Sequence, residues 1–261
     1  SYRQLARVFE QKYDFVYHLA AEFGRINGEE YYDTLWQTNV IGTRNILELQ
    51  KLHGFRLIFA SSSEIYGDKH REILTEDIPL QDSIIQQNDS AVTKWVNEIQ
   101  CMNFEKRYGL PIVRLRFFNA YGPGEYYHNY RSVAALFCYR ALHDLPYTVY
   151  KDYHRVFMYI DYFIPTLANV VDRFSPGEVY NIGGRDYHSV EELSKLILDY
   201  LGLDDSQVTY LSQDVHNVQN KRPDISRAAR AFDHNPQITL VEGVPRTLEW
   251  MKKVYRDTVR H

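Results

Sequence analysis

The 261-residue sequence has no excess of positive charge, few cysteines and no long apolar run. Its 30 lysines and arginines are outnumbered by 34 acidic residues, giving a net charge of −4, so nothing indicates binding to nucleic acid or to an anionic membrane. Only two cysteines occur, Cys101 and Cys138, without a CxxC pattern. This predicts reduced thiols in a cytoplasmic protein rather than a disulfide framework. No apolar stretch approaches the ~20 residues that cross a bilayer, and no signal-peptide pattern is present.

Three motifs that carry chemistry are also missing from the sequence. Neither G-x-G-x-x-G nor G-x-x-G-x-x-G occurs, so the phosphate-cradling turn of dinucleotide folds is absent. The histidines are not paired at metal-ligand spacing with carboxylates beside them, which predicts no metal site. There is no Gly-x-Ser-x-Gly elbow, so the serines are not interpreted as hydrolase nucleophiles.

Short buried strands alternate with amphipathic helices in the first half of the chain. Hydrophobic residues form 44% of the sequence, enough for one large or two modest domains. The pattern predicts strands at 14–19, 55–60 and 111–117, a long helix over 29–53, and a helix with Asp89 as its N-cap. Glycines at 54 and 109 end these helices. Such alternation indicates right-handed βαβ crossovers and a mostly parallel sheet.

The regular alternation of strands and helices stops after Gly122, where a polar and aromatic loop begins. A helix over about 131–143, a strand at 147–150 and a helix opened by the capping box at Ser189 are predicted next. We therefore expect a sheet domain made of 1–122 and about 155–185. A smaller lobe would comprise about 123–154 and 186–261.

Several motifs in a fixed order carry a resemblance to a known family. They are Tyr17-His18-Leu19-Ala20-Ala21, Asn39-Val40-Ile41-Gly42-Thr43, Ser61-Ser62-Ser63-Glu64-Ile65-Tyr66-Gly67, Lys94, and Arg116-Phe117-Phe118-Asn119-Ala120-Tyr121-Gly122-Pro123. In this order they resemble the extended short-chain dehydrogenase/reductase family, the NAD-dependent epimerases, dehydratases and decarboxylases of nucleotide sugars. The resemblance implies an α/β, Rossmann-like doubly wound parallel sheet. This chain would lack the N-terminal strands of that sheet and carry a small mixed α/β C-terminal substrate lobe.

The resemblance also implies catalytic roles. Ser62 aligns with the family's catalytic serine or threonine, and Glu64 with a glutamate that dehydratases and decarboxylases use; the pattern is closest to UDP-glucuronate decarboxylases. A surface glutamate near a turn is the alternative for Glu64. Lys94 matches the lysine of the Tyr-x-x-x-Lys pair, which lowers the pKa of the tyrosine. The tyrosine position holds Ser90, so proton abstraction should be badly impaired, through either an engineered substitution or natural loss of activity.

Contacts to cofactor and substrate follow from the same alignment. The residues expected to bind NAD are Ala20, Ala21, Asn39, Ala60, Lys94, Phe117 and Phe118. Those expected to contact substrate are Asn119, Arg155 and Arg222, because amides and guanidinium groups suit sugars, carboxylates and phosphates. A solvated charge cluster is the competing interpretation of the segment that contains Arg222. Buried core packing is the competing interpretation of the two phenylalanines.

The predicted ligands are NAD and a nucleotide sugar, with a UDP-sugar favoured, and the predicted assembly is a homodimer through the helix at 29–53 and the Lys94 helix. We expect the chain to begin after the first third of the family's nucleotide-binding sheet, as a piece of a longer protein or with that part supplied by a second chain. The alternative function is a nucleotide-sugar-binding protein without catalysis, which Ser90 favours.

Overall fold

A four-stranded parallel sheet forms the centre of the N-terminal half in the computed structural model, which describes residues 1–69, 73–212 and 217–256. Its strands, in spatial order, are β1 (Phe15–His18), β2 (Arg56–Ser62), β3 (Ile112–Phe117) and β8 (Val179–Ile182). The interior of β2 and nearly all of β3 are buried, as expected for parallel strands that are covered on both faces. Strands β1 and β8 are the outer strands of this sheet.

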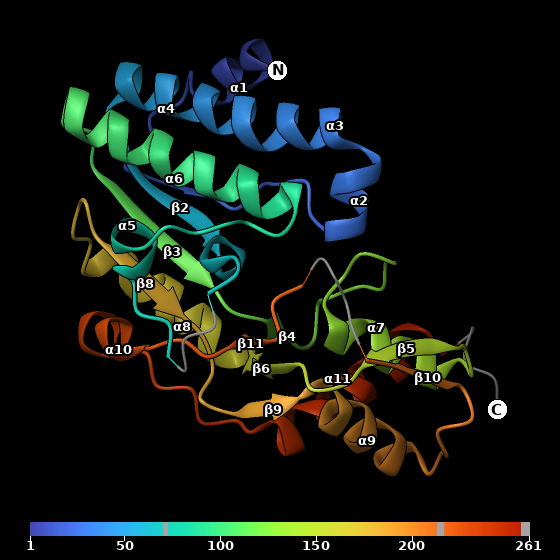
Figure 1. Cartoon of the computed structure of the whole chain (residues 1–261). Coiled ribbons are helices and arrows are strands. Elements are labelled where there is room, and N and C mark those ends of the chain that lie inside the picture. The colour runs from blue at the N-terminus through green and yellow to red at the C-terminus, as the bar shows by residue number, and fades with distance from the viewer. Residues whose placement is uncertain (70–72, 213–216, 257–261) are drawn as a thin grey trace.

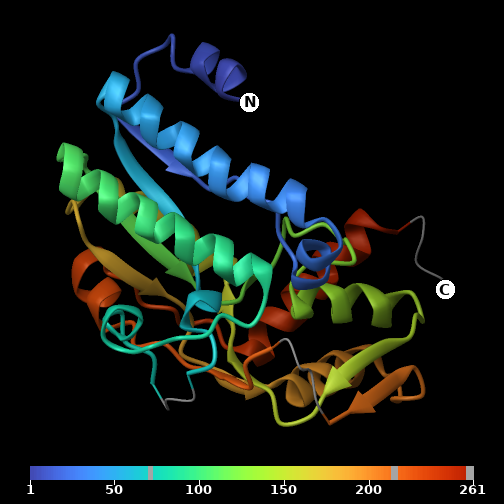
Figure 2. The ribbon, with the colours of Figure 1, turned by 45° about the horizontal axis from the view of Figure 1, so that its top comes forward.

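Helices cover both faces of the main sheet, as Figures 1 and 2 show. On one face lie α1 (Tyr2–Val8), α4 (Gly42–His53) and α6 (Asp89–Tyr108), which share an apolar core with β2. On the other face lie α8 (Ile160–Asp172) and α10 (Ser226–Phe232). The doubly wound α/β arrangement therefore holds for the sheet that this chain contains. Helix α10 falls in the range 186–261 that was expected to form the lobe, yet it packs on the main sheet.

The long helix predicted over 29–53 is interrupted. It consists of α2 (Arg25–Glu30), α3 (Tyr32–Trp36), the π-helical turn η1 (Gln37–Ile41) and α4. Gly54 ends α4 in the left-handed conformation, with φ of 73°, which confirms the predicted glycine stop. The predicted N-cap of α6 is wrong by one residue. Asn88, not Asp89, is the cap, because the extended backbone of Asn88 lets its side chain accept a hydrogen bond from the amide of Ala91.

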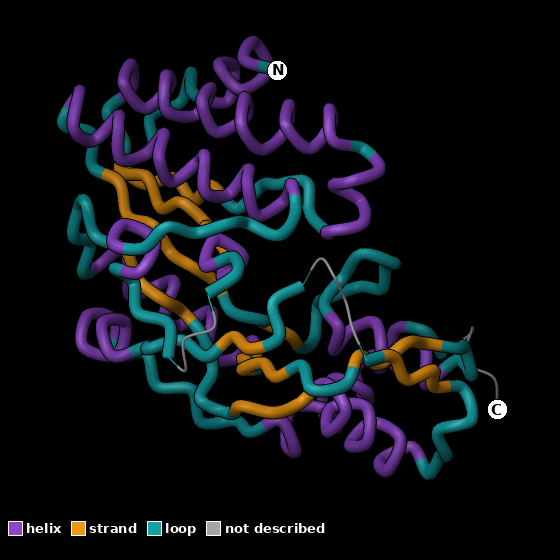
Figure 3. Tube along the Cα trace, viewed as in Figure 1, coloured by secondary structure: helices purple, strands orange, loops and turns teal. Residues whose placement is uncertain are grey.

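The C-terminal half forms a smaller lobe of helices and short strands (Figure 3). Its apolar core is built from α7 (Val133–Leu142), α9 (Val190–Leu201) and α11 (Leu240–Val254). Strand β5 (Tyr147–Tyr150) pairs in parallel with β10 (Val208–Leu211). Strand β6 (His154–Val156) pairs antiparallel with β9 (Tyr187–Ser189) and parallel with β11 (Asn220–Lys221). The lobe therefore contains both helices and strands, and its strands pair in both parallel and antiparallel directions.

Short elements connect the main sheet to the lobe. Strand β4 (Ala120–Tyr121) pairs with β7 (Met158–Tyr159), and η2 (Ser63–Tyr66) and α5 (Ile78–Gln81) follow β2. Strand β8 returns to the main sheet at residues 179–182, inside the range expected to belong to it. Among the residues described, no helix is both long and apolar enough to span a membrane.

Candidate active site

The carboxyl ends of the four parallel strands lie at one edge of the main sheet. Strand β1 ends at His18, β2 at Ser62, β3 at Phe117 and β8 at Ile182. Ser62 stands opposite Phe117 in the sheet register, and Phe117 stands opposite Ile182. Open parallel α/β sheets bind their ligands beyond this edge, so it is where the predicted site residues should gather.

Lys94 of α6 reaches the end of β2. Its Nζ donates a hydrogen bond to the carbonyl of Ala60 at 2.9 Å and lies 5.5 Å from the ring centre of Phe59. Burial lowers the pKa of Lys94 to about 8, although the nearby charge of Glu98 acts to raise it. Ala60 lies two residues before Ser62, so the predicted ammonium and hydroxyl groups lie at the same strand end.

Glu64 is held from two sides just after Ser62. The Oγ of Ser62 accepts a hydrogen bond from the amide of Glu64 at 3.2 Å and caps η2. The Glu64 carboxylate forms an ion pair with Lys221 of β11 and accepts a hydrogen bond from Asn88 at 3.4 Å. The Lys221 side chain is only 3% exposed and that of Glu64 is 26% exposed. Glu64 therefore lies within a defined polar cluster and is not a solvated surface residue.

Ser90 lies in the first turn of α6, four residues before Lys94, where the two positions share a helix face. It is half-buried, and its carbonyl accepts a hydrogen bond from the Thr93 hydroxyl at 2.9 Å. The position expected for a phenol therefore holds a side chain that is shorter by a ring.

Asn39 connects the segment after β1 to α6. It is 1% exposed and lies in the π-helical turn η1. Its side chain accepts a hydrogen bond from the Glu22 amide at 2.8 Å, donates to the Glu22 carbonyl at 3.1 Å, and donates to the Thr93 hydroxyl at 3.1 Å. Asn39 therefore braces the segment after β1 against α6, and π-helical turns are frequent at functional sites. Its role toward a cofactor remains a prediction.

The other residues predicted to bind the cofactor differ in exposure. Ala20 is exposed and Ala21 is half-buried just after β1, so this strand end is open to a ligand. Phe117 is half-buried and packs edge-on against Phe163 at 4.6 Å. Phe118 is fully buried in an apolar cluster. Of the two phenylalanines, only Phe117 has surface at the sheet edge, and Phe118 is a core residue.

Asn119 follows β3 in the left-handed region, with φ of 39°, where asparagine is tolerated better than most residues. Its Nδ2 donates a hydrogen bond to the Val156 carbonyl at 3.1 Å, which fixes the turn between β3 and β4.

Arg155 is 5% exposed. Its guanidinium donates to the carbonyls of His154 and Gln219 at 2.8 and 2.7 Å, to the side chain of Asn217 at 2.9 Å, and to the Val218 carbonyl. Arg155 therefore supports the segment leading into β11. The structure does not bring it together with Ser62 and Lys94 through any contact among the described residues.

Arg222 and Lys221 are neighbours with different environments. Arg222 is exposed, with its guanidinium 5.5 Å from the ring centre of Tyr187, while Lys221 is buried against Glu64. Arg222 was predicted from the sequence to be a site residue, whereas Lys221 was not. Because successive strand side chains point to opposite faces, the pair Lys221-Arg222 could have indicated that one cation points inward.

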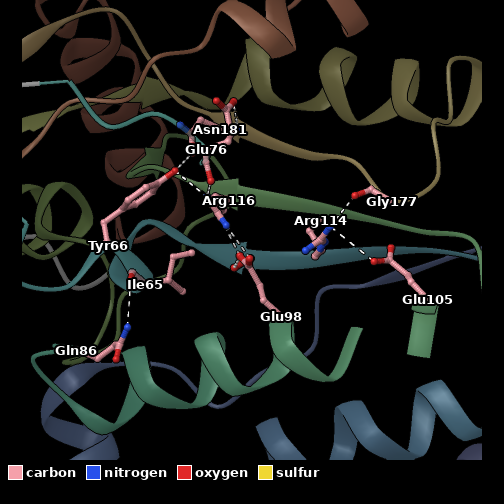
Figure 4. A network of polar contacts seen from close by, with 11 residues as sticks. Ile65, Tyr66, Glu76, Gln86, Glu98, Glu105, Arg114, Arg116, Gly177 and Asn181 are labelled. Atoms are coloured by element: carbon pink, nitrogen blue, oxygen red, sulfur yellow. Dashed lines mark hydrogen bonds and ion pairs between the residues drawn. The ribbon is translucent and has the colours of Figure 1, made fainter. Parts of the chain in front are cut away.

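A buried polar network beneath the site was also missed (Figure 4). The Arg116 guanidinium holds both oxygens of Glu98, at 2.9 and 2.8 Å, and donates to the Tyr66 hydroxyl at 3.0 Å. The hydroxyl of Ser61 donates to Glu98, and that of Tyr66 donates to Asn181 at 2.7 Å. Since Ser61 and Tyr66 flank the segment that carries Ser62 and Glu64, this network fixes the backbone on which both are mounted.

The parallel sheet is covered by helices on both faces and has lysine, serine and glutamate side chains at its carboxyl edge. This architecture defines an α/β protein, a class that binds its ligands beyond that edge. Among the described residues, no group of three or more histidines, cysteines or carboxylates is placed to hold a metal ion. The chain belongs to the NAD dependent epimerase/dehydratase family, whose model matches residues 1–183. The resemblance predicted from the sequence is confirmed.

Individual relatives are distant. UDP-N-acetyl-alpha-D-glucosaminuronate decarboxylase of Bacillus cytotoxicus is 28% identical over 94% of this chain and 79% of its own length. UDP-glucuronic acid decarboxylase 1 of Xenopus tropicalis is 29% identical over 92% of this chain, which spans 57% of that protein.

Two solved structures show the same fold. An epimerase of Methanothermobacter thermautotrophicus matches with a TM-score of 0.89 at 28% identity, over 99% of this chain and 77% of the other. UDP-glucuronic acid 4-epimerase of Bacillus cereus, in complex with UDP-glucuronic acid and NAD, has a TM-score of 0.84 at 25% identity, over 98% of this chain and 79% of the other.

Proposed function

We propose that the protein to which this chain belongs uses NAD to modify a nucleotide sugar, with UDP-glucuronate or another NDP-hexose as substrate. The sugar is oxidised transiently at C4 and is then epimerised, dehydrated or decarboxylated. The observation that carries the proposal is the hydrogen bond from Lys94 to the carbonyl of Ala60, two residues before Ser62. The UDP-glucuronic acid and NAD bound to the Bacillus cereus relative support it.

The strand ends fit the nicotinamide and ribose part of NAD. Ala20 and Ala21 leave the end of β1 open, Lys94 lies at the end of β2, and Phe117 offers a half-buried ring at the end of β3. Lys94 would hold ribose hydroxyls, and Asn39 would keep the segment after β1 in place. When bound, NAD accepts a hydride from the sugar and later returns it.

The chain's own groups would act on the sugar. The Ser62 hydroxyl would donate a hydrogen bond to the sugar oxygen as its charge changes. The Glu64 carboxylate, held in place by the ammonium of Lys221, would move a proton next to the oxidised carbon. Asn119 and Arg222 would hold the sugar and diphosphate. Arg155 was predicted from the sequence to contact the substrate directly. Its guanidinium donates hydrogen bonds to backbone carbonyls, so we propose instead that Arg155 supports the segment leading into β11, which carries Lys221.

A second candidate, binding without catalysis, is favoured by Ser90. A serine has no phenolate to accept the sugar proton, and a water in its place is a poorly positioned base. The separating experiment restores Ser90→Tyr in the full-length protein and measures NADH formation and sugar products with UDP-glucuronate. Activity in the Ser90→Tyr protein, and none in a Ser90→Tyr/Lys94→Met protein, identifies a disabled enzyme. Inactivity of Ser90→Tyr with retained UDP-glucuronate binding identifies a binding protein.

We also propose a homodimer through α4 and α6. Exposed apolar side chains mark this region, with Ile41 46%, Leu52 69% and Ile99 38% exposed. Burial of such groups against a second copy is favourable. The molar mass by light scattering should correspond to two chains and should fall to one chain in an Ile99→Glu variant. A monomer in the unsubstituted protein would contradict the proposal.

A further inference from the structure

The guanidinium of Arg222 lies against an aromatic ring that is itself held in place. Tyr187 is the first residue of β9 and stands opposite Val156 of β6 in the antiparallel register. Its hydroxyl donates a hydrogen bond to Asn220 at 2.9 Å, and its ring stacks on His154 at 5.5 Å with an interplanar angle of 28°. The ring therefore has contacts to both of the other strands of its three-stranded sheet, β6 and β11.

The backbone of Arg222 is also fixed. Its carbonyl accepts a hydrogen bond from the amide of Leu74 at 2.7 Å, and the adjoining Pro223 forms a parallel bridge with Leu74. The side chain nevertheless remains exposed. A long arginine side chain has about 2 kcal/mol of rotamer entropy to lose on binding, so a neighbouring surface that limits its orientations reduces that loss.

We infer that Tyr187 is a positioning residue that orients Arg222 toward the diphosphate of a nucleotide-sugar ligand. The inference rests on the proposed function, because the diphosphate is the ligand group that Arg222 would hold. Arginine suits this group, since its planar fork binds phosphate oxygens bidentately and stacks on aromatic faces at the same time. Lys221 cannot replace it, because the Lys221 ammonium is buried against Glu64.

The size of the effect follows from the cation–π contact. Such contacts contribute about 0.5–1 kcal/mol at exposed sites, which corresponds to a roughly two- to fivefold change in affinity. A Tyr187→Leu variant should therefore bind UDP two- to fivefold more weakly while binding UMP, which lacks the second phosphate, as the unsubstituted chain does. Tyr187→Phe keeps the ring and should retain the UDP to UMP affinity ratio.

The test is a calorimetric titration of UDP and UMP into the chain and its variants. The set includes Arg222→Ala and the double variant Tyr187→Leu/Arg222→Ala. We expect the double variant to bind UDP no more weakly than Arg222→Ala alone, because Tyr187 acts only through Arg222. The matched control is Tyr210→Leu, since Lys151 lies at the same 5.5 Å from the Tyr210 ring on β10; it should leave the ratio unchanged.

Three outcomes would overturn the inference. One is an unchanged UDP to UMP ratio in Tyr187→Leu when Arg222→Ala lowers it. Another is an equal loss of affinity for UDP and for UMP in both Tyr187→Leu and Tyr187→Phe, which would show that Tyr187 has only a structural role. The third is additive losses in the double variant. If the unsubstituted chain binds neither nucleotide, the proposed function itself is wrong, a result distinct from UDP binding that ignores Tyr187.

Discussion

Removal of one member of the buried Arg116–Glu98 pair should cost a large part of the stability of this protein. The Arg116 side chain is 1% exposed and that of Glu98 is 0% exposed, and the guanidinium donates hydrogen bonds to both carboxylate oxygens. Burial acts to lower the pKa of Arg116, but the Glu98 charge and its hydrogen bonds outweigh burial and raise it. Because a guanidinium is not deprotonated in proteins, Arg116 in a Glu98→Met variant would remain charged without its counterion.

The expected loss for Glu98→Met is about 3–5 kcal/mol in the free energy of unfolding, as for other buried pairs that lose one partner. Since whole domains are stable by about 5–15 kcal/mol, this loss is large. The double variant Glu98→Met/Arg116→Met leaves no uncompensated charge. Its remaining cost is the lost hydrogen bonds to Ser61, to Tyr66 and to the Glu76 carbonyl, at about 1 kcal/mol each, so it should be more stable than Glu98→Met.

Urea unfolding followed by circular dichroism measures these differences. The matched control is Glu48→Gln, which breaks the Arg44–Glu48 pair. That pair has an N···O distance of 2.7 Å, but its side chains are 49% and 34% exposed, so its loss should cost under about 0.5 kcal/mol. A Glu98→Met loss as small as the control, or a double variant less stable than Glu98→Met, would refute the reasoning.

Three further predictions concern other buried groups. Burial raises the pKa of Glu105 to about 7, although the charge of Arg114, 3.6 Å away, acts to lower it. Between about pH 4.5 and 7 the folded state therefore binds more protons than the unfolded state. The melting temperature should fall as pH rises through that range, and Glu105→Gln should flatten the fall; equal slopes would contradict this. Lys94, dimethylated with labelled formaldehyde, should titrate in NMR near the lowered pKa of about 8, and a Lys94 resonance that titrates above pH 10 would contradict it. Gly184→Ala should destabilise the fold by more than 1 kcal/mol, because its Cβ would lie 2.1 Å from the Phe157 carbonyl oxygen; an unchanged urea midpoint would count against this contact.

Local features of the chain were largely predictable from sequence. The strand at 55–60 corresponds to β2, and the glycines at 54 and 109 end helices with φ of 73° and 66°, because these signals depend on neighbouring residues alone. The choice between Asn88 and Asp89 as N-cap was not predictable, since both side chains suit the role and only the backbone conformation selects one.

Contacts between distant segments account for what the sequence did not show. Lys221 and Glu64 are 157 positions apart. Strand alternation indicates that one of Lys221 and Arg222 points inward, but it does not identify Glu64 as the partner of that residue. Two partners of Arg116 likewise come from α6 and η2, 18 and 50 positions away in the sequence, and these elements meet β3 in the folded structure. Ser62, Glu64 and Lys94 were predicted from the motifs and lie at the sheet edge, whereas the ion pair of Glu64 with Lys221 is visible only in the tertiary structure.

The outer position of β1 affects how this chain should behave in solution. Among the described strands β1 pairs only with β2, so the amide and carbonyl groups on its outward side are available to another extended segment. Exposed strand edges of this kind favour self-association, and the neighbouring Leu19, 51% exposed, adds an apolar contact. Concentrated samples of the chain alone should therefore tend to aggregate, and a charged substitution at Leu19 should delay the onset of turbidity.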